Sequence, residues 1–144
     1  MVKVPLREVA FDSKVKGVIH PTFTYMSNEL VPGCNTYLEF TWIKSMPEPR
    51  VVVPKMHSHP YDQIELLIGS DPENPENLGA EVECHVGGKK FTVDKTNALF
   101  IPRGVKHGRV EWKRFDRPHM LVSITLGTGN FREANPGGRL PNTK

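Results

Sequence analysis

Residues 51–69 read VVVPKMHSHPYDQIELLIG and join an apolar β-branched run to two histidines, an amide and a carboxylate. In an extended strand alternate side chains share a face, so His57 and His59 are expected to point the same way. Two imidazoles in an apolar surrounding need a partner, and a metal ion is an economical one. A short motif of this kind also arises by chance, so alone it leaves open a surface pair or one satisfied by backbone carbonyls.

The composition is that of one ordinary globular domain: 144 residues, 38% hydrophobic and 24% charged. Thirteen prolines and twelve glycines, spread along the chain, indicate many short elements with frequent turns and favour an all-β fold. No apolar run approaches the ~20 residues that cross a bilayer, and the N-terminus shows no apolar secretory region. We therefore expect a cytoplasmic location without membrane contact, and the net charge of +3 gives no argument for nucleic acid.

The two cysteines, Cys34 and Cys84, are fifty residues apart and match no zinc-knuckle spacing. A disulfide is conceivable from the sequence, but reduced thiols are expected in a cytoplasmic protein. Cys84 alternates with Val82 and Val86, so we interpret it as a core residue rather than a nucleophile.

Turn-forming residues divide the chain into short segments that alternate apolar and polar residues or are rich in β-branched ones. The loops expected between them include 45–50 and 70–78, each with two prolines, and a hairpin turn at Gly87-Gly88. We expect one domain, in which residues of about 22–126 form a β-barrel core, 1–21 form an N-terminal arm and 127–144 form a loose tail. The predicted strands are 36–43, 51–56, 64–68, 80–86, 89–93, 98–101, 110–112 and 119–126. Such a pattern is typical of a sandwich or a barrel.

A third histidine, His107, ends the motif P-x-G-x-x-H at 102–107, directly after a predicted buried strand. Proline fixes the exit from that strand, and Gly104 permits a tight turn. The turn can bring His107 back beside His57 and His59. Three imidazoles and one oxygen donor suit Zn, Fe, Ni or Mn.

These two motifs, H-S-H-P-Y-D-Q-I-E-L-L-I-G and I-P-R-G-V-K-H, resemble those of the cupins, small β-barrels with a central metal. The resemblance covers about 51–126 and implies a single-domain double-stranded β-helix, or jelly-roll, barrel. It also implies a homodimer, to which the N-terminal segment could contribute an exchanged strand.

The sequence departs from the cupin pattern at several positions. Val51 and Thr96 stand where glycines are expected, and Glu111 replaces an asparagine. The glutamate ligand of the first motif is replaced by Gln63 at the three-residue spacing, and Glu65 comes one residue after the four-residue spacing. Some single-domain cupins, including hydroxynitrile-lyase-like ones, resemble this sequence in using glutamine. We expect Gln63 as the fourth ligand, with Glu65 as its partner or as the alternative ligand.

Further residues are assigned from their place near these motifs. The resemblance implies a pocket acid or base at His119, twelve residues after His107, although a histidine without a role fits equally well. Glu65 is the other candidate proton carrier, and Tyr61 and Arg103 are candidates for contacts with substrate at the entrance. Six basic residues within 103–117 either form a solvated face or attract a carboxylate substrate.

The resulting functional hypothesis is an enzyme with one divalent transition metal per chain. It would act on a small substrate with a carboxylate or carbonyl group, as a lyase, decarboxylase or isomerase, or as a dioxygenase with iron. The alternative is a non-catalytic cupin module that binds the metal and a small ligand.

Overall fold

The computed structural model describes residues 7–9, 15–19, 22–53 and 55–130. Eleven strands occupy this part of the chain, which contains no helix, and consequently none that could span a membrane. The strands are β1 (Arg7–Val9), β2 (Lys16–Val18), β3 (Thr22–Met26), β4 (Thr36–Glu48), β5 (Val51–Val53), β6 (Asp62–Gly69), β7 (Asn77–Val86), β8 (Lys89–Lys95), β9 (Asn97–Ile101), β10 (His107–Phe115) and β11 (His119–Leu126). The all-β prediction is confirmed.

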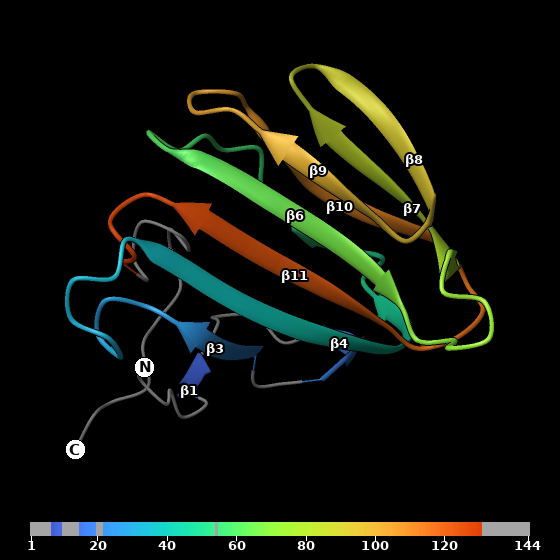
Figure 1. The fold of residues 1–144 in the computed structure, drawn as a ribbon. Coiled ribbons are helices and arrows are strands. Elements are labelled where there is room, and N and C mark those ends of the chain that lie inside the picture. Colours follow the sequence, from blue (N-terminus) through green and yellow to red (C-terminus); the bar gives the residue numbers. More distant parts are fainter. Residues whose placement is uncertain (1–6, 10–14, 20–21, 54, 131–144) are drawn as a thin grey trace.

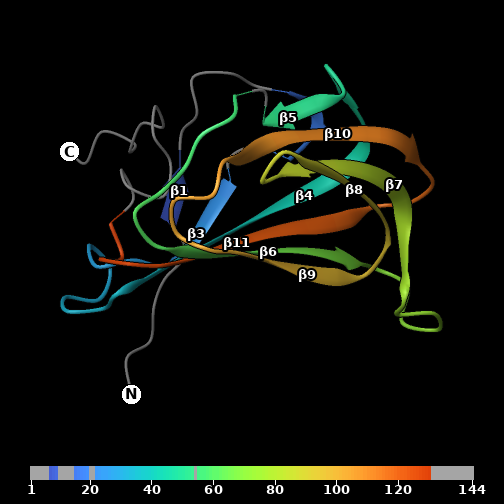
Figure 2. The same ribbon diagram turned by 90° about the horizontal axis from the view of Figure 1, so that it is seen from above.

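Two antiparallel sheets form the molecule. The larger has the order β1-β3-β4-β11-β6-β9, with β2 also paired to β4, and the smaller has the order β5-β10-β7-β8. Figure 2 shows the two sheets facing each other, and Figure 1 looks onto the outer face of the larger one. Strands that are far apart in the sequence are neighbours in each sheet, as in a jelly roll.

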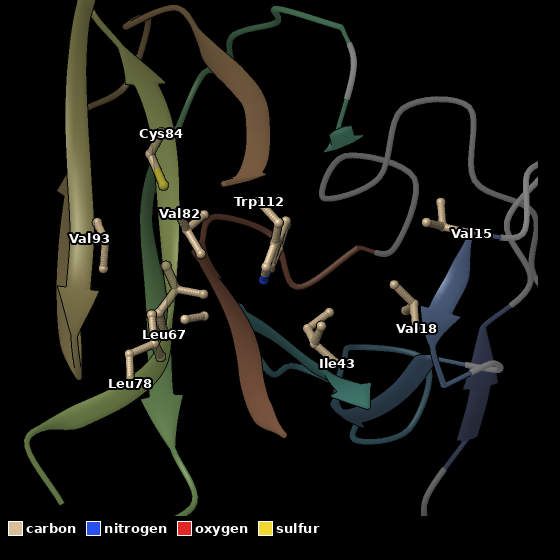
Figure 3. Packing of buried hydrophobic residues seen from close by; sticks show 10 residues of the cluster. Val15, Val18, Ile43, Leu67, Leu78, Val82, Cys84, Val93 and Trp112 are labelled. Carbon is tan, nitrogen blue, oxygen red and sulfur yellow. The ribbon is translucent and has the colours of Figure 1, made fainter. Parts of the chain in front are cut away.

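The strand register places alternate side chains between the sheets. Three rows of residues cross the larger sheet on its inner face: Tyr37, Thr125, Gln63 and Ile101; then Glu39, Ser123, Glu65 and Leu99; then Thr41, Leu121, Leu67 and Asn97. The apolar core fills the end of the interior beyond the third row, around the fully buried Trp112, Val82 and Ile43 (Figure 3). Val15 and Val18, within the expected N-terminal arm, belong to this core.

Two strand predictions are wrong in detail. The expected loop at 45–50 is largely strand, because β4 continues to Glu48. Pro47 is tolerated there because β11 pairs with β4 only as far as Ile43, so that edge needs no further N–H donor. The strand expected at 51–56 ends at Val53, so His57 and His59 project from an irregular segment rather than from one regular strand.

The cysteines behave as expected from their context. Both are free, and Cys84 is buried in the core. Burial raises the pKa of the Cys84 thiol to about 12, so the thiolate that a nucleophile needs is strongly disfavoured.

Candidate metal centre

Three histidines meet at one end of the space between the sheets. Their candidate ligand nitrogens all lie within 4.8 Å of one another. His59 and His107 are 4% and 5% exposed, and His57 is half-buried. The structure thus brings together the three histidines that the two motifs predict, and leaves one of them near solvent.

Backbone pairing holds the irregular histidine segment against the start of β10. His57 and His107 exchange two backbone hydrogen bonds of 2.8 Å, and the Gly104 N–H donates to the His59 carbonyl at 2.8 Å. Gly108 has a φ of 127°, and a Cβ there would collide with the carbonyl of Lys55. The glycine is therefore needed for the close approach that places His57.

Backbone carbonyls set the tautomers of two of the rings. His57 Nδ1 lies 3.0 Å from the Lys55 oxygen, and His107 Nδ1 lies 3.0 Å from the Val105 oxygen. Since a carbonyl oxygen only accepts, each Nδ1 carries the proton, and in the neutral ring the Nε2 lone pair remains for a metal. Burial lowers the pKa of His107, which favours this neutral form.

His59 is oriented by Tyr61. The Tyr61 hydroxyl lies 3.1 Å from His59 Nδ1, and the two rings stack at a centroid distance of 5.0 Å and an angle of 13°. Tyr61 is 6% exposed. Tyr61 can therefore fix the orientation of the His59 ring. Residues that contact metal ligands, without binding the metal themselves, commonly have this role.

Gln63 completes the group of donors. Its Nε2 donates to Ser123 Oγ at 3.1 Å and to Glu65 Oε1, which turns Oε1 toward His107. Gln63 Oε1 lies 3.0 Å from His107 Nε2. With the His107 proton on Nδ1, both of these atoms are acceptors, and no hydrogen is available between them.

That distance matches two ligands of one metal ion. Two atoms about 2.1 Å from a common metal, at right angles to each other, lie about 3 Å apart. The lone pairs of His107 Nε2 and Gln63 Oε1 are therefore arranged as neighbouring ligands would be. The donor set of three imidazoles and one amide oxygen fits a divalent transition metal.

A small cavity extends from this centre into the interior. Its volume is about 120 Å³, below the several hundred typical of pockets for drug-sized ligands, so it has room only for a small molecule. Its polar wall, apart from the candidate ligands, is formed by Glu39, Thr41, Glu65, His85 and Ser123. The apolar wall is formed by Leu67, Val86, Leu99, Ile101, Val110 and Leu121, beside Cys84.

Glu65 is a buried carboxyl group in the polar wall of this cavity. Burial raises the pKa of its carboxyl to about 7, and the Glu39 charge acts in the same direction. Hydrogen bonds from Ser123 and Gln63 act in the opposite direction. A carboxyl with such a pKa can both give and take a proton near neutral pH.

The structure does not bring His119 to the metal centre. His119 is fully buried; its Nε2 accepts from Trp112 Nε1 at 2.8 Å, and its Nδ1 donates to the Arg117 carbonyl at 2.9 Å. It lies six residues along β11 from Thr125, the neighbour of Gln63, which is about 20 Å in a strand. Both ring nitrogens of His119 therefore already have hydrogen-bond partners, and the residue does not line the cavity.

Arg103 lies on the surface, and its guanidinium is 3.4 Å from Asp62 Oδ2. Most basic residues of 103–117 likewise form ion pairs with nearby carboxylates. These residues are Arg103, Arg109, Lys113, Arg114 and Arg117. This pattern supports a solvated, charge-balanced face more than a patch that attracts carboxylates.

Two residues of the site, Ser123 and Gly108, were not predicted from the sequence. Ser123 bonds to both Gln63 and Glu65, yet it is 58 residues from Glu65 in the sequence. Gly108, which accommodates the Lys55 carbonyl, directly follows the second motif. The importance of Gly108 depends on its contact with Lys55, which is distant in the sequence, so the motif alone does not indicate it.

No family model and no curated protein matches the sequence. Solved structures do match the fold. An RmlC-like cupin from Shewanella frigidimarina is 12% identical with a TM-score of 0.52, over 87% of this chain and 86% of that one. A predicted oxalate decarboxylase from Thermotoga maritima is 14% identical with a TM-score of 0.56, over 88% and 99% of the two chains.

KdgF from a Halomonas species is 14% identical with a TM-score of 0.51, over 83% of this chain and 86% of that one. At these identities the likenesses concern the fold. The chain has the cupin fold, and the resemblance seen in its two histidine motifs is confirmed at that level.

Proposed function

We propose that this chain is a metal-dependent enzyme of the cupin type, acting on a small ligand with a carbonyl or carboxylate group. One divalent transition metal would be held by His57, His59, Gln63 and His107. The observation that carries the proposal is the 3.0 Å approach of two acceptor atoms, Gln63 Oε1 and His107 Nε2. Two lone pairs so close together repel each other unless a cation lies between them.

A metal bound there would act as a Lewis acid toward an oxygen of the ligand. The protein would supply the remaining functions. The apolar wall around Leu99 and Leu121 keeps water away from the ligand, and Glu65 lies in the cavity with a pKa suited to moving a proton. These roles fit a lyase, decarboxylase or isomerase, and with iron a dioxygenase.

Metal content tests the site directly. Elemental analysis of purified protein, after incubation with Mn, Fe, Zn or Ni and desalting, should find about one ion per chain. His57→Ala should remove most of it, while His85→Ala, whose ring is bonded to Glu83 instead, should not. Folded wild-type protein that retains none of the four metals would refute the proposed site.

Turnover separates the enzyme from the non-catalytic module. Fe- and Mn-loaded protein should be screened against small carboxylates and carbonyl compounds, with oxygen consumption and product analysis as readouts. Turnover that Glu65→Gln abolishes at saturating metal would support the enzyme. Tight ligand binding without turnover for any compound would favour the binding module.

A further inference from the structure

We propose that Glu65 and Ser123 are positioning residues that orient and polarise the Gln63 amide, so that a carboxylate acts on the metal through the amide. This inference rests on the metal site proposed above. It explains how Gln63 can replace the glutamate ligand that the first histidine motif has in other cupins. The carboxylate is retained, but it lies one row deeper in the cavity.

The arrangement follows from the strand register. Gln63 and Glu65 are two residues apart on β6, so both point to the inner face, and Ser123 is the neighbour of Glu65 on β11. Gln63 Nε2 donates one hydrogen to Ser123 Oγ at 3.1 Å and the other to Glu65 Oε1. Ser123 Oγ in turn donates to Glu65 Oε1 at 3.0 Å, which closes a ring of three hydrogen bonds.

The ring settles which end of the amide faces the histidines. A glutamine side chain can turn over and present its NH₂ group, which has no lone pair to offer a metal. Here both Nε2 hydrogens have acceptors on the cavity side, and the reversed orientation would place the carbonyl oxygen against the carboxylate of Glu65, which has no hydrogen to donate when ionised. The cost of that reversal keeps Oε1 directed at His107.

The same bonds strengthen the oxygen as a ligand. Hydrogen bonds to a carboxylate are stronger than those between neutral groups, and hydrogen-bonded chains polarise one another. An amide that donates to Glu65 carries more negative charge on Oε1. The arrangement parallels the carboxylate–histidine–metal triads in which a carboxylate acts through a ligand's second nitrogen.

Cobalt(II) affinity and spectra provide a test that does not depend on activity. We expect Ser123→Ala to weaken Co(II) binding about tenfold, and Glu65→Leu to weaken it up to about a hundredfold, with a changed visible absorption spectrum. Thr92→Ala, which removes an exposed hydroxyl from β8, outside the cavity, should leave both unchanged. Melting of the metal-free proteins reports any loss of folding separately.

A charge exchange gives the sharpest comparison. In the double variant Gln63→Glu/Glu65→Gln the carboxylate becomes the ligand and the amide its support, so Co(II) affinity should recover to at least the wild-type value. Glu65→Gln alone keeps a side-chain acceptor without its charge and should bind about tenfold more weakly than wild type. Wild-type affinity in Ser123→Ala, Glu65→Gln and Glu65→Leu would overturn the inference but keep the metal site. Failure of the wild type to bind Co(II) would overturn both.

Discussion

Single residues acquire their roles here from the hydrogen bonds that surround them. His119 and His107 are both buried histidines at the start of a strand, but their nitrogens have different partners. The Nε2 of His107 faces another acceptor, Gln63 Oε1, whereas the Nε2 of His119 accepts a hydrogen bond from Trp112 Nε1. The arrangement at His107 places two acceptors together, as around a cation. The hydrogen bond at His119 already pairs a donor with an acceptor.

The environment of His119 predicts a pH dependence of stability. Burial lowers its pKa in the folded state, so as the pH falls through about 6.5 the unfolded chain takes up the proton first. The contribution of His119 to stability is therefore present at high pH and lost toward low pH. The variant His119→Gln can still accept from Trp112 and donate to Arg117 but does not titrate.

We accordingly expect the difference in unfolding free energy between wild type and His119→Gln to decrease from pH 8 to pH 5, as measured by urea unfolding. Other titrating groups are common to both proteins and cancel in the difference. A difference that does not change with pH would contradict the role assigned to His119 as a neutral core residue.

At the scale of elements, the site depends on how an irregular segment is held against a strand. Residues 55–59 have no regular sheet pairing of their own, yet the bridge between His57 and His107 and the bond from Gly104 fix them beside β10. Prolines at 54 and 60 remove two backbone donors and so disfavour a continuous strand there. Two of the candidate ligands, His57 and His59, thus lie on chain that the sheets position but do not contain, whereas Gln63 and His107 lie on β6 and β10.

Gly108→Ala should disturb this contact specifically. Its Cβ would meet the Lys55 carbonyl, pushing His57 away from His107, and we expect at least tenfold weaker metal binding together with a lower melting temperature. Gly88→Ala is the matched control. Gly88, in the turn between β7 and β8, also has a positive φ, of 77°, but no atom lies within 4 Å of a Cβ there. That variant should show backbone strain of about 1 kcal/mol with metal affinity retained. Equal loss of affinity in both variants would argue against the contact.

At the scale of the whole molecule, the outer face of the larger sheet is unusual. An antiparallel sheet with one face on the core commonly turns a polar face outward. Here eleven outward positions on four adjacent strands are apolar, with the polar Thr36, Lys44 and Asp62 at their margin, and no described element covers them (Figure 1). They are Leu38, Phe40, Trp42, Ile64, Leu66, Ile68, Ala98, Phe100, Met120, Val122 and Ile124. Phe100 is 61% exposed.

We predict that a second copy of the chain covers this face. From strand spacing and residue rise, the patch measures on the order of 400 Å², which is in the range that marks interaction sites. It is about half of what a standard interface buries per partner, so a surrounding rim must contribute the rest. A twofold axis would place the apolar patch opposite itself and needs no other partner.

Sedimentation or light scattering should therefore find a dimer at micromolar concentration. Val122→Lys, at the centre of the patch, should give a folded monomer because two lysines would be buried against each other across the axis. Thr92→Lys, on the exposed surface of β8, should leave the dimer intact. A monomeric wild type at high concentration would contradict the prediction.

The sequence alone determined the all-β class, most strand positions and the three histidines, because these depend on local alternation, turn residues and short motifs. It favoured Gln63 over Glu65 as the fourth ligand and associated His119 with the pocket. Only the tertiary structure shows that Gln63 Oε1 faces His107 and that His119 is bonded within the core. The bonds that fix these positions join residues such as Glu65 and Ser123, which are 58 positions apart and meet through strand register alone. Local sequence carries strand periodicity, but it does not carry the identity of a neighbour across the sheet.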